Sequence, residues 1–189
     1  TTVSASTTSH LFLNLNAETT YYFAIFPYAN TNSNVLYNTS VSSNKCSAQT
    51  PSTPIFPVTW INEFHYDNAG DDVNEQVEIV LKNSDQYNLS DIELILYNGG
   101  DGKKYGTHAL STFSQGETDR DYSVFSKNII GLQNGPDGFA LSYQYVLIPG
   151  TFISYGSSVF TATDGPANGV TSKNVGVLES GTTPTTSSI

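Results

Sequence analysis

The chain has 189 residues, of which 7 are basic and 17 acidic, and its formal net charge at pH 7 is −10. This balance excludes a nucleic-acid-binding surface, because duplex binding requires clustered Lys and Arg side chains that neutralise phosphates. The single cysteine, Cys46, excludes an intrachain disulfide and a thiolate metal cluster. No run of apolar residues approaches the roughly 18 that a membrane span needs, so we expect no transmembrane segment.

Only 13% of the residues are charged, and Thr, Ser, Asn, Gly and Tyr are abundant. This composition resembles that of secreted and surface β-proteins more than that of cytosolic enzymes. We therefore expect an extracellular or cell-surface location.

Short segments with an apolar period of two predict β-strands along the whole chain, and no stretch sustains a helical period. In chain order these segments are HLFLNL, TTYYFAIFPY, EQVEIVL, IELILY, FALSYQYVLI and TFISYGSSVF. Clusters of Gly, Asn, Asp and Pro separate them, and such residues form turns. Short strands joined by turns predict an all-β sandwich architecture.

A proline-rich seam divides the chain into two parts. Pro51, Pro54 and Pro57 fall within one short stretch, where they stiffen the backbone and interrupt any sheet ladder. We predict a linker over residues 51–57, with one domain over residues 1–50 and a second domain from residue 58 onward.

The segment LNAETTYYFAIFPYAN, residues 15–30, has the spacing L-x-x-x-T-x-Y-x-F. Over residues 8–50 this part resembles the closing strands of a fibronectin type III domain, although Ala17 stands where that family usually has Pro. The resemblance implies an incomplete immunoglobulin-like sandwich. It also implies that Tyr21 is the tyrosine-corner residue, whose hydroxyl ties the crossover between the sheets to the backbone.

The closing strands alone leave an apolar face and an open edge of that sandwich exposed. We expect either that the preceding strands lie upstream in a longer parent chain, or that another chain supplies them. The second alternative is a filament built by strand complementation. The expected partners are other proteins or copies of this chain, bound through exposed strand edges.

Four segments in the second part carry a further resemblance. They are INEFHYDNAGDDVNEQVEI, LILYNGGDGKKY, LQNGPDGFAL and FTATDGPANGVTSKNVGV, in this order. Over residues 58–178 they resemble the lamin-tail domain family in its bacterial extracellular form, with Gln76 in place of a bulky apolar residue. The resemblance implies a second immunoglobulin-like sandwich in tandem, usually a non-catalytic accessory module. Residues 179–189, ESGTTPTTSSI, are polar and predict a tail or linker.

The window from Glu63 to Glu78 is rich in carboxylates and holds neither Lys nor Arg. Residues 58–66 and 75–82 are predicted as neighbouring strands, so DNAGDD connects them. Carboxylates clustered on a turn offer the oxygen ligands that calcium binds, although no EF-hand loop is present. The candidate calcium ligands are Asp67, Asp71, Asp72 and Glu75, joined by Asp137 and Asp164 from two later loops. The alternative is a solvated edge that only forms turns.

No pattern in the sequence indicates catalysis. His10, His65 and His108 lie far apart without a metal-binding spacing, and no serine stands in G-x-S-x-G. Glu63 and Glu75 can be paired as acid and base, but a chain rich in acids offers such pairs by chance. We therefore expect neither enzymatic activity nor a required cofactor. The abundant aromatic residues are expected mainly in the core, with stacking on sugars as the alternative.

Two functions remain. The first is a non-catalytic structural or interaction module of a secreted or cell-surface protein, such as a filament or adhesin subunit. The second is an accessory region of an extracellular hydrolase, a nuclease or a protease, whose catalytic domain lies outside this sequence.

Overall fold

The computed structural model describes residues 12, 15–31, 34–40, 44–50, 52 and 55–189. These residues form strands and one-turn 3₁₀ helices, which confirms the predicted all-β fold. The chain divides into two compact units, Thr1–Ile55 and Phe56–Ile189. Within the described residues, no helix is long and apolar enough to cross a membrane.

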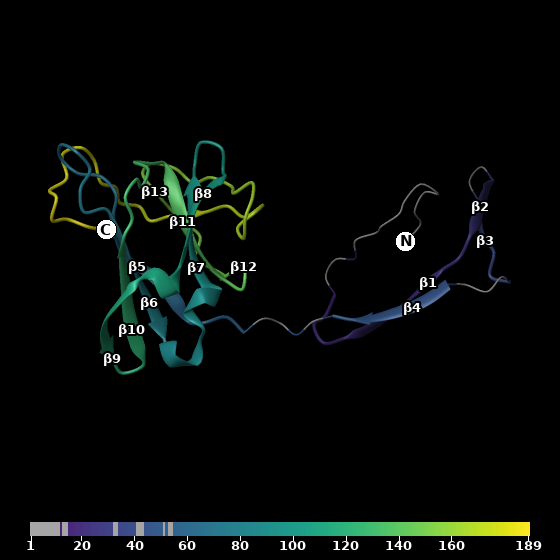
Figure 1. Cartoon of the computed structure of the whole chain (residues 1–189). Coiled ribbons are helices and arrows are strands. Elements are labelled where there is room, and N and C mark those ends of the chain that lie inside the picture. The colour runs from purple at the N-terminus through teal and green to yellow at the C-terminus, as the bar shows by residue number, and fades with distance from the viewer. Residues whose placement is uncertain (1–11, 13–14, 32–33, 41–43, 51, 53–54) are drawn as a thin grey trace. The chain divides into compact units, whose positions relative to one another are not determined.

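The first unit is a β-ribbon of two antiparallel strand pairs (Figure 1). β1 (Thr20–Ile25) pairs with β4 (Asn44–Gln49), and β2 (Tyr28–Thr31) pairs with β3 (Asn34–Tyr37). Aromatic and β-branched residues favour the extended backbone of β1, whose sequence is TYYFAI.

None of the residues of the first unit whose side-chain burial is described is buried. Tyr22 is 83% exposed and Ile25 is 73% exposed, and every side chain of β4 is exposed. Phe12 packs on Phe23 with ring centroids 5.1 Å apart. A two-stranded sheet without a core is only marginally stable in water.

Some predictions for the first part concern residues outside those described. Most of the predicted strand HLFLNL, with His10, lies outside them, as do Pro51 and Pro54. The predicted linker is too long at its C-terminal end: Phe56 packs against the core of the second unit, and Pro57 is buried.

The second unit contains the remaining strands. They are β5 (Thr59–His65), β6 (Gln76–Lys82), β7 (Ile92–Asn98), β8 (Lys104–Ala109), β9 (Ser114–Asp119), β10 (Tyr122–Asn128), β11 (Asp137–Tyr143), β12 (Val146–Leu147), β13 (Ile153–Tyr155) and β14 (Lys173–Asn174). They form a four-stranded sheet in the order β5-β6-β10-β9 and a six-stranded sheet in the order β14-β13-β11-β7-β8, where β12 also pairs with β11 (Figure 1). The 3₁₀ helices Ser84–Gln86, Leu89–Asp91 and Leu110–Thr112 lie in the connections.

The two sheets of the second unit pack face to face around the main core. Val77, Ile79 and Leu81 of β6 are fully buried there, in one cluster with Leu94 of β7 and Phe139 of β11. Because successive side chains of a strand point to opposite faces, the i, i+2 spacing in β6 places its apolar residues on the core side. The second unit is therefore a β-sandwich, as predicted.

The six-stranded sheet is also buried on its outer face. Ile95 and Tyr97 of β7 pack there with Phe152, and Ala162 and Ala167 from the loop after β13 join this second cluster. Strands covered on both faces have no reason to alternate polar and apolar residues. This double burial explains the continuous burial of the middle of β7 and of nearly all of β11.

Residues 179–189 are part of the second unit, so the prediction of a polar tail or linker was wrong (Figure 1). The backbone N–H and C=O of Ile189 exchange two hydrogen bonds of 2.9 Å with Phe64, at the edge of β5 that β6 does not cover. The N–H of Ala69 donates to the carbonyl of Thr183, and Glu179 is buried. Composition misled the prediction because backbone hydrogen bonds, which any residue can make, hold this segment.

The hydroxyl of Tyr97 holds the covering loop in place: it accepts from the N–H of Ala167 at 3.1 Å and donates to the carbonyl of Asp164 at 3.2 Å. We expect Tyr97→Phe to lower the free energy of unfolding by about 1–3 kcal/mol, because the buried N–H loses its acceptor. Urea denaturation followed by the fluorescence of Trp60 measures this, since the only Trp of the chain lies in the second unit. Tyr122→Phe, at a half-exposed ring, is the control, and an equal loss there would contradict the expectation.

Candidate functional site

Within the acidic window, Asp67, Asp71, Asp72 and Glu75 lie in the connection between β5 and β6, and their side chains have different surroundings. Asp67 lies near the carboxylates of Asp72 and Glu179. Asp72 accepts from the side-chain amide of Asn134 at 3.1 Å. Glu75 is buried, and its Oε2 accepts from the backbone N–H of a later loop at 2.6 Å.

Asp137 and Asp164 lie elsewhere and each hold a turn of their own. The carboxylate oxygens of Asp137 accept from the N–H groups of Gly99 and Gly135 at 2.8 and 2.9 Å. A Cβ at Gly99 would collide with the carbonyl of a neighbouring turn, so this close approach requires glycine. Asp164 accepts from the backbone N–H of Lys104 at 2.9 Å.

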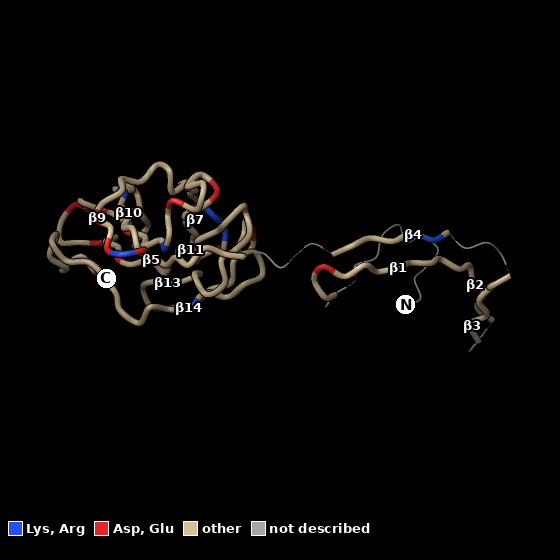
Figure 2. Tube along the Cα trace, turned by 90° about the horizontal axis from the view of Figure 1, so that it is seen from below, with Lys and Arg blue, Asp and Glu red and all other residues tan. Residues whose placement is uncertain are grey.

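The six predicted calcium ligands therefore do not form one site. In the part of the chain that the structure describes, no group of three or more His, Cys, Asp or Glu side chains is placed to hold a metal ion. Figure 2 shows the acidic residues of the second unit at separate places along the trace. We assign none of the six as a metal ligand, and the geometry favours the turn-forming alternative.

The most buried polar cluster lies at the end of β5 and joins it to the C-terminal segment. Nδ1 of His65 is 2.7 Å from Oε1 of Glu179, and each side chain is only 2% exposed. Oε2 of Glu179 accepts from the backbone N–H of Tyr66 at 2.6 Å and of Asp67 at 3.1 Å. The N–H of Glu179 donates to the hydroxyl of Tyr66 at 2.8 Å. The carboxylate is thus held from three sides.

Asn68 fixes the other side of the imidazole ring. Its side-chain NH₂ donates to the carbonyls of Ala69 and Asp71, at 3.2 and 2.8 Å. Its Oδ1 accepts from the N–H of Val73 at 3.0 Å and lies 3.1 Å from Nε2 of His65. The orientation of the amide follows from these partners, because only the NH₂ can donate to two carbonyls.

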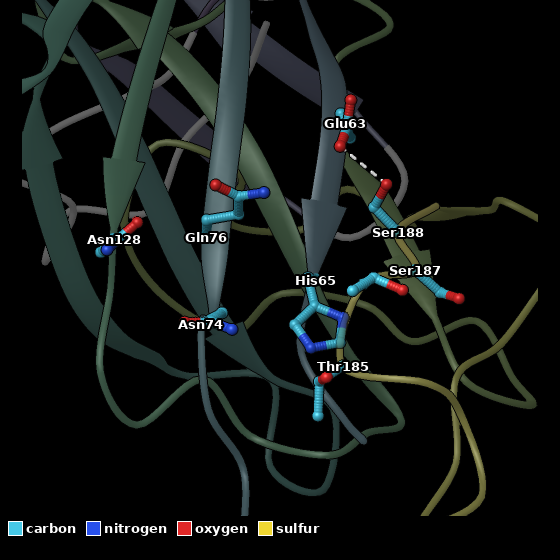
Figure 3. A pocket seen from close by; sticks show the side chains of 9 residues that line it. Glu63, His65, Asn74, Gln76, Asn128, Thr185, Ser187 and Ser188 are labelled. Atoms are coloured by element: carbon cyan, nitrogen blue, oxygen red, sulfur yellow. Dashed lines mark hydrogen bonds between the residues drawn. The ribbon is translucent and has the colours of Figure 1, made fainter. Parts of the chain in front are cut away.

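A polar pocket of about 360 Å³ lies beside this pair (Figure 3). Ser188 donates to Oε1 of Glu63 at 2.7 Å, so the C-terminal segment forms one wall of the pocket. The lining residues, all polar, are Glu63, His65, Asn74, Gln76, Asn128, Thr185, Thr186, Ser187 and Ser188.

Three carboxyl or imidazole groups in this region have raised pKa values, and burial also raises the pKa of Tyr66. Burial lowers the pKa of His65, but hydrogen bonds, above all to Glu179, outweigh burial and raise this pKa above its ordinary value. Burial raises the pKa of Glu75. Burial and the nearby carboxylates of Asp72 and Glu179 raise the pKa of Asp67. All three groups therefore bind protons more tightly in the folded chain than in the unfolded chain.

His65 is not available as a general base in this arrangement. Such a base needs a ring nitrogen or carboxylate that can reach a substrate proton, but both nitrogens of His65 already have partners. Glu63 and Glu75 do not share a site, because Glu63 lines the pocket and Glu75 is buried on the N–H of Gly131. His108 lies on β8, and burial together with Lys127 lowers its pKa.

Sequence reasoning missed Glu179 and Asn68. The available signal was that Glu179 is the only charged residue in ESGTTPTTSSI, since an isolated charge in a neutral segment is a candidate for a specific partner. Nothing in the sequence indicated that this partner is His65, which precedes Glu179 by 114 residues.

Tyr21 makes the contact expected of a tyrosine corner. Its hydroxyl accepts a hydrogen bond of 2.9 Å from the backbone N–H of Asn16, five residues upstream. This bond ties the segment before β1 to the ribbon.

Comparisons of the chain with protein-family models, curated proteins and solved structures found no match. The resemblances to fibronectin type III and lamin-tail domains therefore stay predictions. A fold alone does not define a function, so the function must be inferred from the geometry of this chain.

We expect a calcium chelator to leave the unfolding temperature of the second unit unchanged, because its acidic side chains face backbone N–H groups and separate turns. Thermal unfolding with and without chelator, followed by Trp60 fluorescence, measures this. A loss of several degrees that disappears in the double variant Asp71→Asn, Asp72→Asn would restore the calcium prediction.

We expect Glu179→Ala to lower the free energy of unfolding by about 3–5 kcal/mol, because it leaves a buried imidazole and two backbone N–H groups without their acceptor. The matched control is Glu117→Ala on β9, where the side chain is exposed and a change below about 0.5 kcal/mol is expected. Urea denaturation of both variants measures these free energies of unfolding. Similar losses in the two variants would show that the buried pair contributes no more to stability than an exposed side chain.

Proposed function

We propose that the chain is a non-catalytic structural and interaction module of an extracellular or cell-surface protein, and that its first unit associates with further β-strands. The observation that carries this proposal is the ribbon of β1 to β4, in which no residue of described burial is buried. The composition supports the location, because it is typical of secreted β-proteins.

The pairing register gives the ribbon one apolar face. Tyr21 lies opposite Ala48, and Phe23 lies opposite Cys46. Residues directly opposite each other in an antiparallel pair share a face, and Ile25 continues this face at the end of β1. Covering it with a second sheet would stabilise the ribbon by about 25 cal/mol for each Å² of apolar surface removed from water.

The edges of the ribbon support association as well. In the described residues β1 pairs only with β4, so each of these strands has one side without a neighbouring strand. Backbone N–H and C=O groups along such a side are a template for the addition of a strand. The hydrogen bond between Tyr21 and Asn16 supports the same proposal, because tyrosine corners are features of sandwiches made of two sheets.

In this proposal the missing strands come either from another part of a parent chain or from a second copy. The second alternative builds a filament or adhesin subunit by strand complementation. The second unit is an immunoglobulin-like sandwich of the lamin-tail kind and acts as a stable spacer or accessory module.

The size of the 189-residue chain in solution, measured by light scattering after chromatography, tests the proposal. Polymers whose mass grows with protein concentration are expected if copies supply the strands. Ile25→Asp, on the apolar face, should then reduce association, whereas Ile130→Asp, at a residue 97% exposed in the second unit, should not. A monomer with unprotected amides in β1 and β4 would indicate strands from a parent chain.

The contrary result is a monomer in which the amides of β1 and β4 are strongly protected from hydrogen exchange. Such a ribbon would be stable without any partner, and the proposed association would be abandoned.

A further inference from the structure

Both ring nitrogens of His65 face oxygens that accept hydrogen bonds. Nε2 faces Oδ1 of Asn68, whose amide orientation is fixed by two carbonyls, and Nδ1 faces Oε1 of Glu179. A neutral imidazole has only one N–H and would leave one of these contacts without a proton. The pair of His65 and Glu179 must therefore hold two protons in this geometry.

The second proton belongs on the imidazole. Oε2 of Glu179 accepts from the N–H groups of Tyr66 and Asp67, and such bonds favour the ionised carboxylate. With the carboxylate ionised, the proton between Oε1 and Nδ1 lies on Nδ1. The contact is then a buried ion pair between an imidazolium and a carboxylate.

Other groups around the ring favour the same charge. The remaining titratable side chains near His65 are Glu63 on β5, Asp67, Asp72 and Glu75 in the connection to β6, and Tyr66, which is hydrogen-bonded to Glu179. The side chains that β6 and β10 contribute to the adjoining pocket, Gln76 and Asn128, are uncharged. None of these groups is a cation that would oppose a positive charge on the imidazole.

The ion pair joins β5 to the last residues of the chain, which continue along it as far as the two hydrogen bonds between Ile189 and Phe64. We propose that residues 179–189 form a proton-dependent latch on β5, closed while His65 is an imidazolium and opened when His65 loses a proton. This inference goes beyond the proposed function, because it concerns the second unit and does not depend on the ribbon.

Opening has two structural consequences. The N–H and C=O of Phe64 lose their partners, so the edge of β5 becomes available for pairing with another strand. The wall formed by residues 185–188 also leaves the pocket, and Glu63 loses the hydrogen bond from Ser188. The latch thus controls a strand edge and a pocket together.

The direction of the pH effect follows from the raised pKa of His65. The stabilisation of the closed latch is complete below the pKa of an unfolded histidine, about 6.5. It is lost as the pH rises from there through the pKa of the folded chain. Over this interval the opening constant is expected to rise about tenfold per pH unit, and then to level off. The raised pKa values of Asp67 and Glu75 also make the folded chain less stable as the pH rises, but this effect begins at more acidic pH.

Nitrogen-15 NMR of the imidazole ring in the full chain tests the protonation state. At pH 6 both ring nitrogens of His65 are expected to be protonated, and the ring should lose one proton only above pH 6.5. Hydrogen-exchange protection of the amides of Tyr66 and Ala69, corrected for the intrinsic rate, should fall over the same interval. A ring with a single protonated nitrogen at pH 6 would overturn the proposal.

The variant Glu179→Gln is designed to keep the hydrogen bonds of the latch without requiring a protonated imidazolium. The amide oxygen can still accept from the N–H groups of Tyr66 and Asp67, while the NH₂ can donate to Nδ1 of a neutral ring. We expect the protection of Ala69 in this variant to be independent of pH above 6.5. His108→Gln is the control and should keep the pH dependence of the unchanged chain. The proposal fails if Glu179→Gln retains the tenfold change per pH unit.

Discussion

A β-sheet is stable in water only when its apolar face is covered, and its uncovered edge N–H and C=O groups are open to pairing with another strand. The second unit meets this constraint inside itself. Its six-stranded sheet is covered on one face by the four-stranded sheet and on the other by the loop after β13. The edge of β5 is met by the C-terminal segment. In the first unit, the described strands pair with one another, but no described second sheet covers their apolar face. The two proposals follow from this difference between the units.

In the proposed latch, the buried pair of His65 and Glu179 makes the covering of the β5 edge depend on the protonation of His65. Backbone hydrogen bonds alone would hold residues 179–189 at any pH, because amides do not titrate in the usual range. The buried ion pair requires His65 to be protonated, since a buried charge without its partner is costly. The desolvation of Glu179 is offset here by two backbone N–H donors, which explains why a carboxylate can be buried at this place.

Much of the fold was predictable because period-two patterns report local geometry. The strands predicted over residues 58–66 and 75–82 pair as expected, apart from a bulge between Ile61 and Glu63. The grouping of the six candidate calcium ligands was not predictable in this way. Sequence proximity brought Asp67, Asp71 and Asp72 onto one turn, but whether carboxylates converge depends on which backbone N–H groups lie nearest in space. Asp137 bonds Gly99, a residue 38 positions away.

The sequence by itself determined the all-β class and the approximate division of the chain at the prolines. These properties follow from the spacing of apolar residues and from the fixed geometry of proline, which act over a few residues. Only the tertiary structure decided the pairing of His65 with Glu179 and the place of Ile189 beside Phe64. Contacts between residues more than a hundred positions apart depend on how the sheets stack, and no local pattern encodes that choice.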